Sequence, residues 1–474
     1  MKRILFIFSI LILPHSNCLA QGDILKAGVA QLNITPSVGY PHYRNFGTAV
    51  HDSLYVKAIV FRQGALAWAI AVCDLLWIER SLSSEVRMRV SEKTGIPFDN
   101  ILITATHTHT GPAYHPNIYE LNDHLRKFDG TVEDAISKDR YPTLLADRIS
   151  QALTTAFDSA VPVRIRSYSD TLIDLSFNRR FIMQDGKVRT NPGRGNREIV
   201  KTAGPVDPEL NILRIEKQSD GALIAVVSNF AVHSDTFGGT AFSADYPGVL
   251  AKALEEKFGR NIVSIFLMGA SGDINHLDVR KDGVVLTTEI IGRRLAEKIG
   301  ANLNQEGEGV RPRLDASAEF VYAPLQAYSE EEIQWAKDRQ APAKYGETGL
   351  FQLRRPMKIR SLERIRATEA IPPTINTEPW TLPVEVQVFK LSEEIAVVGL
   401  PGEIFAELGL SIKRISPFRT TLIVELTNSH IAYVPTQKAF TQGSYEVLNS
   451  RLAPGGGELM VQAAAMLLKE LKKE

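Results

Sequence analysis

The sequence predicts an α/β fold built as a single large domain. Strand-like and helix-like stretches alternate from about residue 24 to the C-terminus, which is the pattern of sheets covered by helices. Many of the apolar stretches are continuous runs of Val, Ile, Leu and Ala, as expected of strands that are buried on both faces. The 474 residues contain no internal repeat, low-complexity tract or convincing linker, so we expect one domain.

Eight apolar runs are predicted to be strands because they are short and rich in aliphatic and β-branched residues. In chain order they are part of 49–61, then 66–76, 101–106, 222–232, 262–268, 384–390, 395–400 and 420–426. Four amphipathic segments between and after these runs are predicted to be helices, at 141–160, 246–258, 288–302 and 457–473. Pro142 suits the first turn of the first helix, and Gly259 suits the end of the second.

Two polar stretches, 183–208 and 326–372, interrupt this pattern. Long excursions over an α/β core often shape a substrate cleft, although simple decoration of the surface is the more frequent explanation. The sequence leaves both explanations open.

The overall charge excludes some classes of partner. Lys+Arg and Asp+Glu both number 54, so nothing favours nucleic acid or a strongly charged partner.

The N-terminus predicts export. Lys2 and Arg3 precede an apolar run over 4–13, and small residues at 18 and 20 suit cleavage before Gln21. We therefore expect a signal peptide over 1–20 and a periplasmic or secreted protein. The apolar run is too short for a transmembrane anchor.

The most informative motif is His107-Thr-His109, which directly follows the predicted strand at 101–106. Side chains two apart on a strand face the same way, so both imidazoles would face one site if the strand continues to this point. Neutral imidazole is a good zinc ligand. The alternative is a pair of polar residues that end a strand and bind nothing.

Three further residues share this context, each following an apolar strand: His233, Glu403 and Tyr433. In α/β proteins, sites assemble at the carboxyl ends of strands. Taken singly, each has an ordinary explanation as a buried histidine, a first-turn acid of a helix or a core tyrosine. Asp74 and Asp245 are candidate partners for ligand imidazoles, because such histidines often donate their other N–H to a carboxylate; both also suit a strand end or a helix cap.

Taken together, these segments resemble the neutral ceramidase family, zinc-dependent amidases that remove the fatty acyl group from N-acylsphingosine. The resemblance covers nearly the whole chain after the predicted signal peptide. Its motifs, in order, are Ala27-Gly-Val-Ala-Gln-Leu-Asn-Ile-Thr-Pro36, Ala105-Thr-His-Thr-His-Thr-Gly-Pro112, Asn229-Phe-Ala-Val-His233, Asp245-Tyr-Pro-Gly248, Ser271-Gly-Asp273, Leu400-Pro-Gly-Glu403 and the segment with Tyr433 and Tyr445. It implies a catalytic domain of mixed sheets covered by helices over 21–474, without the β-sandwich domain that follows in full ceramidases.

The resemblance also implies a set of site residues. It places Zn²⁺ on four ligands, His107, His233, Glu403 and Tyr433. It places His109, Arg179 and Tyr445 in the active site, where Tyr445 or Arg179 would stabilise the oxyanion and His109 would protonate the leaving amine. Tyrosine has a free pKa of about 10, so Tyr433 is the least secure ligand.

One departure concerns the mechanism. Asn275 stands where the family has a serine in a Gly-Asp-x-Ser-Pro segment. An asparagine can hydrogen-bond a substrate but cannot be acylated, which favours direct attack by zinc-activated water.

The expected function is therefore an exported zinc-dependent hydrolase of a small N-acylated compound, ceramide or another. Two alternatives stay open: an ester or lactone hydrolase on the same metal site, and a non-catalytic lipid- or carbohydrate-binding protein with the same fold.

Overall fold

The computed structural model describes residues 24–115, 140–259, 261–338, 350–372 and 379–473. The predicted signal peptide over 1–20 lies outside the described residues. Within the described ranges, no helix is both long enough and apolar enough to cross a membrane.

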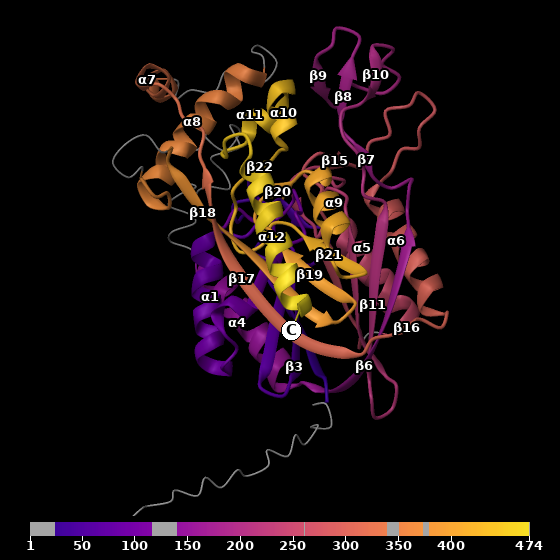
Figure 1. The fold of residues 1–474 in the computed structure, drawn as a ribbon. Coiled ribbons are helices and arrows are strands. Elements are labelled where there is room, and N and C mark those ends of the chain that lie inside the picture. Colours follow the sequence, from indigo (N-terminus) through magenta and orange to yellow (C-terminus); the bar gives the residue numbers. More distant parts are fainter. Residues whose placement is uncertain (1–23, 116–139, 260, 339–349, 373–378, 474) are drawn as a thin grey trace, which may run out of the picture.

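A nine-stranded mixed sheet forms the larger half of the core (Figure 1). Its strands run in the order β14-β12-β11-β6-β1-β3-β4-β5, with β16 paired to β6. The centre is antiparallel, whereas the pairs β12/β14 and β4/β5 near the two ends are parallel. The bounds are β1 Lys26–Asn33, β3 Tyr55–Gln63, β4 Leu66–Cys73, β5 Ile101–Ala105, β6 Val161–Thr171, β11 Glu209–Lys217, β12 Leu223–Phe230, β14 Val263–Met268 and β16 Glu308–Gly309.

A second, four-stranded sheet packs against the first. It consists of β17 (Pro312–Pro324), β18 (Thr381–Ser392), β19 (Ile395–Gly399) and β21 (Thr420–Val424), in that order. Apolar side chains from both sheets share one buried cluster. Within it, Trp68 of β4 stacks on Phe389 of β18 with the ring centroids 5.2 Å apart. Burial on both faces explains the continuous apolar runs seen in the sequence.

Helices cover the outer faces of both sheets. Helices α1 (Arg80–Thr94) and α4 (Tyr141–Asp158) share a core with β1, β3, β4 and β5. Helices α5 (Asp245–Phe258) and α6 (Thr288–Leu303) cover β11, β12 and β14. Helices α9 (Ala406–Ile415) and α12 (Gly456–Lys473) cover the four-stranded sheet, where α12 crosses its face (Figure 1). The result is a four-layer α/β/β/α arrangement.

Short elements lie in the segments that connect the longer strands and helices. They are β2 Ala49–Val50, η1 Phe98–Asn100, β7 Phe177–Asn178, β13 Ala241–Phe242, β15 Ile274–Asn275, β20 Glu403–Ile404, β22 Tyr433–Val434, α10 Gln437–Gln442 and α11 Tyr445–Asn449. The excursion at 183–208 belongs to a small sheet of β8 (Arg180–Met183), β9 (Val188–Thr190) and β10 (Ile199–Thr202). The excursion at 326–372 contains α7 (Glu330–Asp338) and α8 (Leu350–Thr368).

The predicted fold class is confirmed, and each predicted strand and helix corresponds to an element of the structure. Several elements were not predicted, among them β1, β6, β11, β17, α1 and α9. Strand β6 shows why a search for continuous apolar runs misses such strands: its buried residues Val163, Ile165 and Ser167 alternate with more exposed polar ones.

Candidate metal centre and active site

Side chains that follow or belong to four separate strands meet at one site. His107 follows β5 and His233 follows β12, whereas Glu403 and Tyr433 are paired residues of the parallel bridge between β20 and β22. All four residues are buried. The fold therefore brings together the four residues that the sequence pointed to as ligands.

The donor atoms lie at spacings that suit a metal ion. Nε2 of His107 lies 3.0 Å from Nε2 of His233 and 3.5 Å from Oε2 of Glu403, and Nε2 of His233 lies 3.9 Å from the same oxygen. Ligands about 2.0–2.1 Å from a tetrahedral zinc ion stand roughly 3.3 Å apart. The three observed distances between donor atoms, 3.0, 3.5 and 3.9 Å, lie on both sides of this value.

Hydrogen bonds set the tautomers of the two imidazoles. Nδ1 of His107 lies 2.7 Å from the carbonyl oxygen of Leu76, and Nδ1 of His233 lies 3.4 Å from that of Ser271. A carbonyl oxygen can only accept, so in each ring Nδ1 carries the proton and Nε2 presents a lone pair. Two lone pairs that face each other at 3.0 Å repel unless a cation lies between them. Oε2 of Glu403 is also buried without a hydrogen-bond partner in the described part of the chain, so this donor set fits a metal ion.

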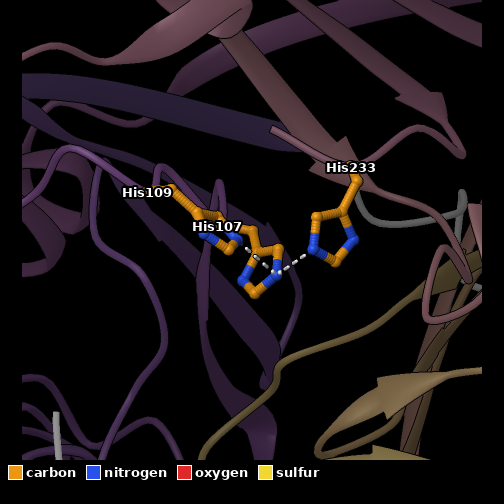
Figure 2. A group of neighbouring side chains, drawn as sticks. All are labelled: His107, His109 and His233. Carbon is orange, nitrogen blue, oxygen red and sulfur yellow. Dashed lines mark hydrogen bonds between the residues drawn. The ribbon is translucent and has the colours of Figure 1, made fainter. Parts of the chain in front are cut away.

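His109 adds a third imidazole to the cluster (Figure 2). Its Nε2 lies 3.3 Å from Nε2 of His107, and its side chain keeps 15% of its surface exposed. Burial, followed by the charge of His107, lowers the pKa of His109 well below its usual value. Nδ1 of His109 lies 3.9 Å from Asp235, which pairs with Arg44 at 2.6 Å. The sequence reasoning missed Asp235, although it lies only two residues after His233.

The route by which the two histidines come together differs from the prediction. Strand β5 ends at Ala105, and His107 has a positive φ of 62°. The alternation of side chains along a strand therefore does not apply to His107 and His109. A positive φ is strained for a residue with a side chain and marks functional turns.

The predicted carboxylate partners of the imidazoles are wrong. Asp74 accepts hydrogen bonds from the Tyr55 N–H and the Thr106 hydroxyl, and Asp245 accepts them from the N–H groups of Thr236, Phe237 and Tyr246. Backbone carbonyls orient the imidazoles instead. Both aspartates instead have the other role considered for them, in which a carboxylate accepts hydrogen bonds at a strand end or at the start of a helix.

Arg179 and Tyr445 lie beside Tyr433. The guanidinium of Arg179 is 5.4 Å from the ring centre of Tyr433 and 5.9 Å from that of Tyr445, and the two tyrosine rings are 5.6 Å apart. Burial raises the pKa of Tyr445, so its hydroxyl stays protonated and able to donate. Burial, followed by the charge of Glu403, raises the pKa of Tyr433 well above its usual value.

Glu446 holds this side of the site in place, and the sequence reasoning missed it. Its buried carboxylate accepts from Nε of Arg179 at 2.9 Å and from Nη1 of Arg180 at 2.8 Å. Nη2 of Arg179 also donates to the carbonyl oxygen of Gly272 at 2.7 Å. The orientation of Arg179 is therefore determined by two partners. The sequence offered a clue to its role, since Glu446 directly follows the predicted active-site residue Tyr445.

Asn275 lies on β15, and its side chain is engaged with neighbouring loops. Its Nδ2 donates to Oδ1 of Asn191 at 2.7 Å, and its Oδ1 accepts from the N–H of Leu277 at 3.0 Å. Asn275 is not among the described residues that line the cavity over the histidines. These contacts connect Asn275 to the loops at Asn191 and Leu277.

A cavity of about 50 Å³ opens onto this cluster. Its lining includes side chains of the cluster and its neighbours, namely Tyr43, His107, His109, Glu403, Tyr433 and Tyr445. Arg354, Met357, Lys358 and Ser361 of α8 also line it, so part of the excursion at 326–372 shapes the cleft.

The family model "Neutral/alkaline non-lysosomal ceramidase, N-terminal" matches residues 27–276. The chain belongs to this family. It is 24% identical over 323 residues to the neutral ceramidase of Pseudomonas aeruginosa, which is 65% of this chain and 45% of that protein. It is 30% identical over 210 residues to neutral ceramidase A of Dictyostelium discoideum, which is 44% of this chain and 27% of that protein. The chain thus matches less than half the length of each of these curated relatives.

Solved structures of ceramidases share this fold. The crystal structure of the neutral ceramidase from Pseudomonas aeruginosa superposes with a TM-score of 0.69 at 20% identity, covering 95% of this chain and 75% of that one. A ceramidase complexed with C2 gives the same TM-score at 18% identity, covering 95% and 76%. The likeness extends over nearly the whole chain and includes the four-stranded sheet beyond residue 276.

Proposed function

We propose that this chain is a zinc-dependent hydrolase that cleaves the N-acyl (amide) bond of a small substrate. The observation that carries the proposal is the convergence of His107, His233 and Glu403 on one point, at 3.0–3.9 Å from one another, beside a cavity that His107 and Glu403 line. Membership of the ceramidase family supports amide hydrolysis as the reaction.

His107, His233 and Glu403 would hold the ion, with Tyr433 as a fourth ligand. Two imidazoles with a carboxylate are a set that suits zinc. When bound, zinc supplies a Lewis acid and lowers the pKa of a water molecule to near neutrality. His109 also lies within reach of the ion, but its partial exposure and its place in the cavity wall favour a role toward the substrate.

The residues around the ion would do the remaining chemistry. The protonated hydroxyl of Tyr445 donates to the carbonyl oxygen as that oxygen gains negative charge, and Arg179 adds a fixed positive charge nearby. His109, whose imidazole burial keeps neutral, would accept a proton at Nε2 from the attacking water and then transfer it to the departing nitrogen, the step that amide cleavage requires. The contacts of Asn275 support a role in holding the loop at 274–277 in place of direct contact with the substrate.

The test combines metal content with hydrolysis. The purified protein is expected to contain about one zinc per chain by elemental analysis and to release fatty acid from N-acyl substrates. His107→Ala should lose both, whereas His51→Ala, which changes an exposed histidine outside the site, should keep both. Wild-type protein that neither contains nor takes up zinc would overturn the proposal. Zinc-loaded protein that cleaves O-acyl but not N-acyl substrates would replace it with the esterase or lactonase alternative.

We also propose that residues 1–20 are a cleaved signal peptide and that 21–474 form the catalytic unit, so that the protein acts in the periplasm or outside the cell. Mass spectrometry of the protein expressed in a bacterium with a working secretion pathway tests this proposal. A mature chain that starts at Gln21 supports it, and an intact N-terminus contradicts it.

A further inference from the structure

Cationic side chains line the cavity beside the proposed metal site. Arg354 and Lys358 come from α8, and Arg451 follows α11, which packs against α8. Among the described residues that line this cavity, the one carboxylate is Glu403, a proposed metal ligand. Two of these cations, Lys358 and Arg451, donate hydrogen bonds to neutral oxygen atoms.

Lys358 and Arg451 are buried without an acidic partner. They are 7% and 5% exposed. Nζ of Lys358 donates to Oε1 of Gln326 at 2.7 Å and to the carbonyl oxygen of Val447 at 3.4 Å, and Nη1 of Arg451 donates to the carbonyl oxygen of His430 at 3.3 Å. In the described part of the chain, neither has a carboxylate within 4.0 Å. Buried cations in proteins are normally paired, so these two are unusual.

A second cavity next to the first contains two further acids. The two cavities share Ser361, His430 and Arg451. The second also contains Glu79 and Glu369, and Glu369 pairs with Arg80 at 3.1 Å. Arg451 therefore has these two acids on the side of the second cavity, whereas Glu403 is the one carboxylate among the described residues that line the first.

The protonation of Lys358 reflects the missing counterion. Burial, followed by the charges of Arg355 and Arg451, lowers the pKa of Lys358 to about 7. Among the described residues, Tyr328 also faces it, with its ring centre 5.7 Å from Nζ. An anion in the cavity would favour the protonated amine and raise this pKa. Binding of the anion is accordingly expected to weaken as the pH rises above about 7.

We propose that the cavity binds an acidic group of the substrate, a carboxylate or a phosphate, between Lys358 and Arg451. The preferred substrate is then an N-acyl compound that carries an anion, in place of the neutral N-acylsphingosine. Arginine and lysine together suit such a group, because the guanidinium binds two oxygens at once and the ammonium adds a compact charge. This inference rests on the proposed N-acyl hydrolase function.

Three matched probes test the proposal: N-dodecanoylglycine, N-dodecanoyl phosphoethanolamine and the neutral N-dodecanoylglycinamide. For the wild-type zinc protein, kcat/KM for one of the two anionic probes is expected to exceed that for the neutral probe by at least about tenfold, equal to roughly 1.4 kcal/mol. Lys358→Met and Arg451→Gln should abolish this preference. Lys201→Met, at an exposed lysine of β10, should keep it.

Thermal unfolding gives a readout that does not depend on activity. The preferred anionic probe should raise the Tm of the wild type and of Lys201→Met, but not that of Lys358→Met. Without a probe, Lys358→Met is expected to be at least as stable as the wild type, because a buried unpaired charge is removed. If Arg451→Gln does not fold, the result for Lys358→Met alone tests the proposal.

The outcomes separate this proposal from the proposed function. Equal hydrolysis of the charged and neutral probes overturns the anion site and leaves the hydrolase intact. Binding of an anionic probe that is lost in Lys358→Met, without hydrolysis of any probe, supports the anion site and contradicts the hydrolase. A difference in kcat/KM between the carboxylate probe and the phosphate probe identifies which acidic group the cavity prefers. A Tm rise that Lys358→Met retains overturns the anion site.

Discussion

Glu425 connects the two halves of the site through a single buried carboxylate. It accepts hydrogen bonds from the N–H of Ile404 at 2.8 Å, the N–H of Ser271 at 3.1 Å and the hydroxyl of Ser271 at 2.5 Å. Ile404 follows the proposed ligand Glu403, and the carbonyl of Ser271 orients His233. Burial raises the pKa of Glu425 to about 8, so its environment is strongly desolvated. Glu425 is therefore a positioning residue.

Glu425→Ala should weaken both the fold and metal binding. It removes the oxygen that accepts from the N–H groups of Ile404 and Ser271, which should cost about 1–3 kcal/mol, and the displaced ligands should lower zinc affinity by roughly 10- to 100-fold. Urea unfolding and competition with a zinc chelator measure the two effects. Glu394→Ala, at an exposed carboxylate, is the matched control. Unchanged zinc affinity in Glu425→Ala would contradict the positioning role.

His42 predicts how stability depends on pH. Its buried ring accepts a hydrogen bond from the N–H of Arg44 at 2.9 Å, and burial, followed by the charge of Arg44, lowers its pKa to about 4 from 6.5. Between these values the unfolded chain binds a proton that the folded chain does not. The stability is therefore complete above pH 6.5 and is lost as the pH falls toward 4, by about 3 kcal/mol in total.

His42→Asn keeps an acceptor for the Arg44 N–H and removes this titration. Its unfolding free energy should fall less steeply than that of the wild type between pH 7 and pH 4.5, as measured by urea unfolding in a series of buffers. The difference between the two proteins isolates His42, because the site histidines are common to both. If the unfolding free energies of the two proteins change with pH in parallel, His42 does not titrate as described.

At the scale of elements, close approach between β1 and α4 depends on one residue without a side chain. A Cβ at Gly28 of β1 would lie 1.9 Å from the carbonyl oxygen of Ala156 in α4. Backbone atoms cannot yield as a flexible side chain can, so the strand and helix would have to separate. This contact anchors the helix layer over β1, β3, β4 and β5.

Gly28→Ala should therefore destabilise the protein by at least about 1–3 kcal/mol, the usual range for overpacking. Gly309→Ala is the control, because this glycine of β16 has no atom within 4 Å of an added Cβ and should change stability by less than about 0.5 kcal/mol. Chemical denaturation measures both. Similar small effects for the two variants would show that α4 can shift without cost.

At the scale of the whole molecule, the proposed ion would join the two sheets. His107 and His233 follow β5 and β12 of the nine-stranded sheet, whereas Glu403 lies between β19 of the four-stranded sheet and α9. An ion held by both groups is present in the folded state alone. Its binding free energy therefore adds to the stability of the fold.

Removal of the metal should lower the Tm in a reversible way. For a free zinc concentration near 1,000 times Kd, the loss corresponds to about 4 kcal/mol, measured by calorimetry before and after chelation and again after zinc is restored. His107→Ala should unfold at the same temperature with and without chelator. If a chelator removes zinc from the wild type without changing its Tm, the ion does not connect the sheets.

The sequence by itself determined the α/β class and the apolar strands, because burial on both faces leaves continuous runs that a periodicity analysis detects. It also indicated the residue types of the candidate site, since His107, His109, His233 and Glu403 follow such strands or the turns after them. It did not reveal β6, whose apolar residues alternate, or α1, which buries Ser83 and Arg87.

Only the tertiary structure decided how the side chains meet. Strand alternation was the wrong reason for the pairing of His107 and His109, because the chain turns at a positive φ of 62° after β5. Backbone carbonyls, not the predicted carboxylates, orient the imidazoles, and Glu446, Glu425, Lys358 and Arg451 acquire their surroundings from segments far away in the chain. The physical reason is that hydrogen bonds and desolvation depend on distances across the fold, which composition and spacing along a chain do not contain.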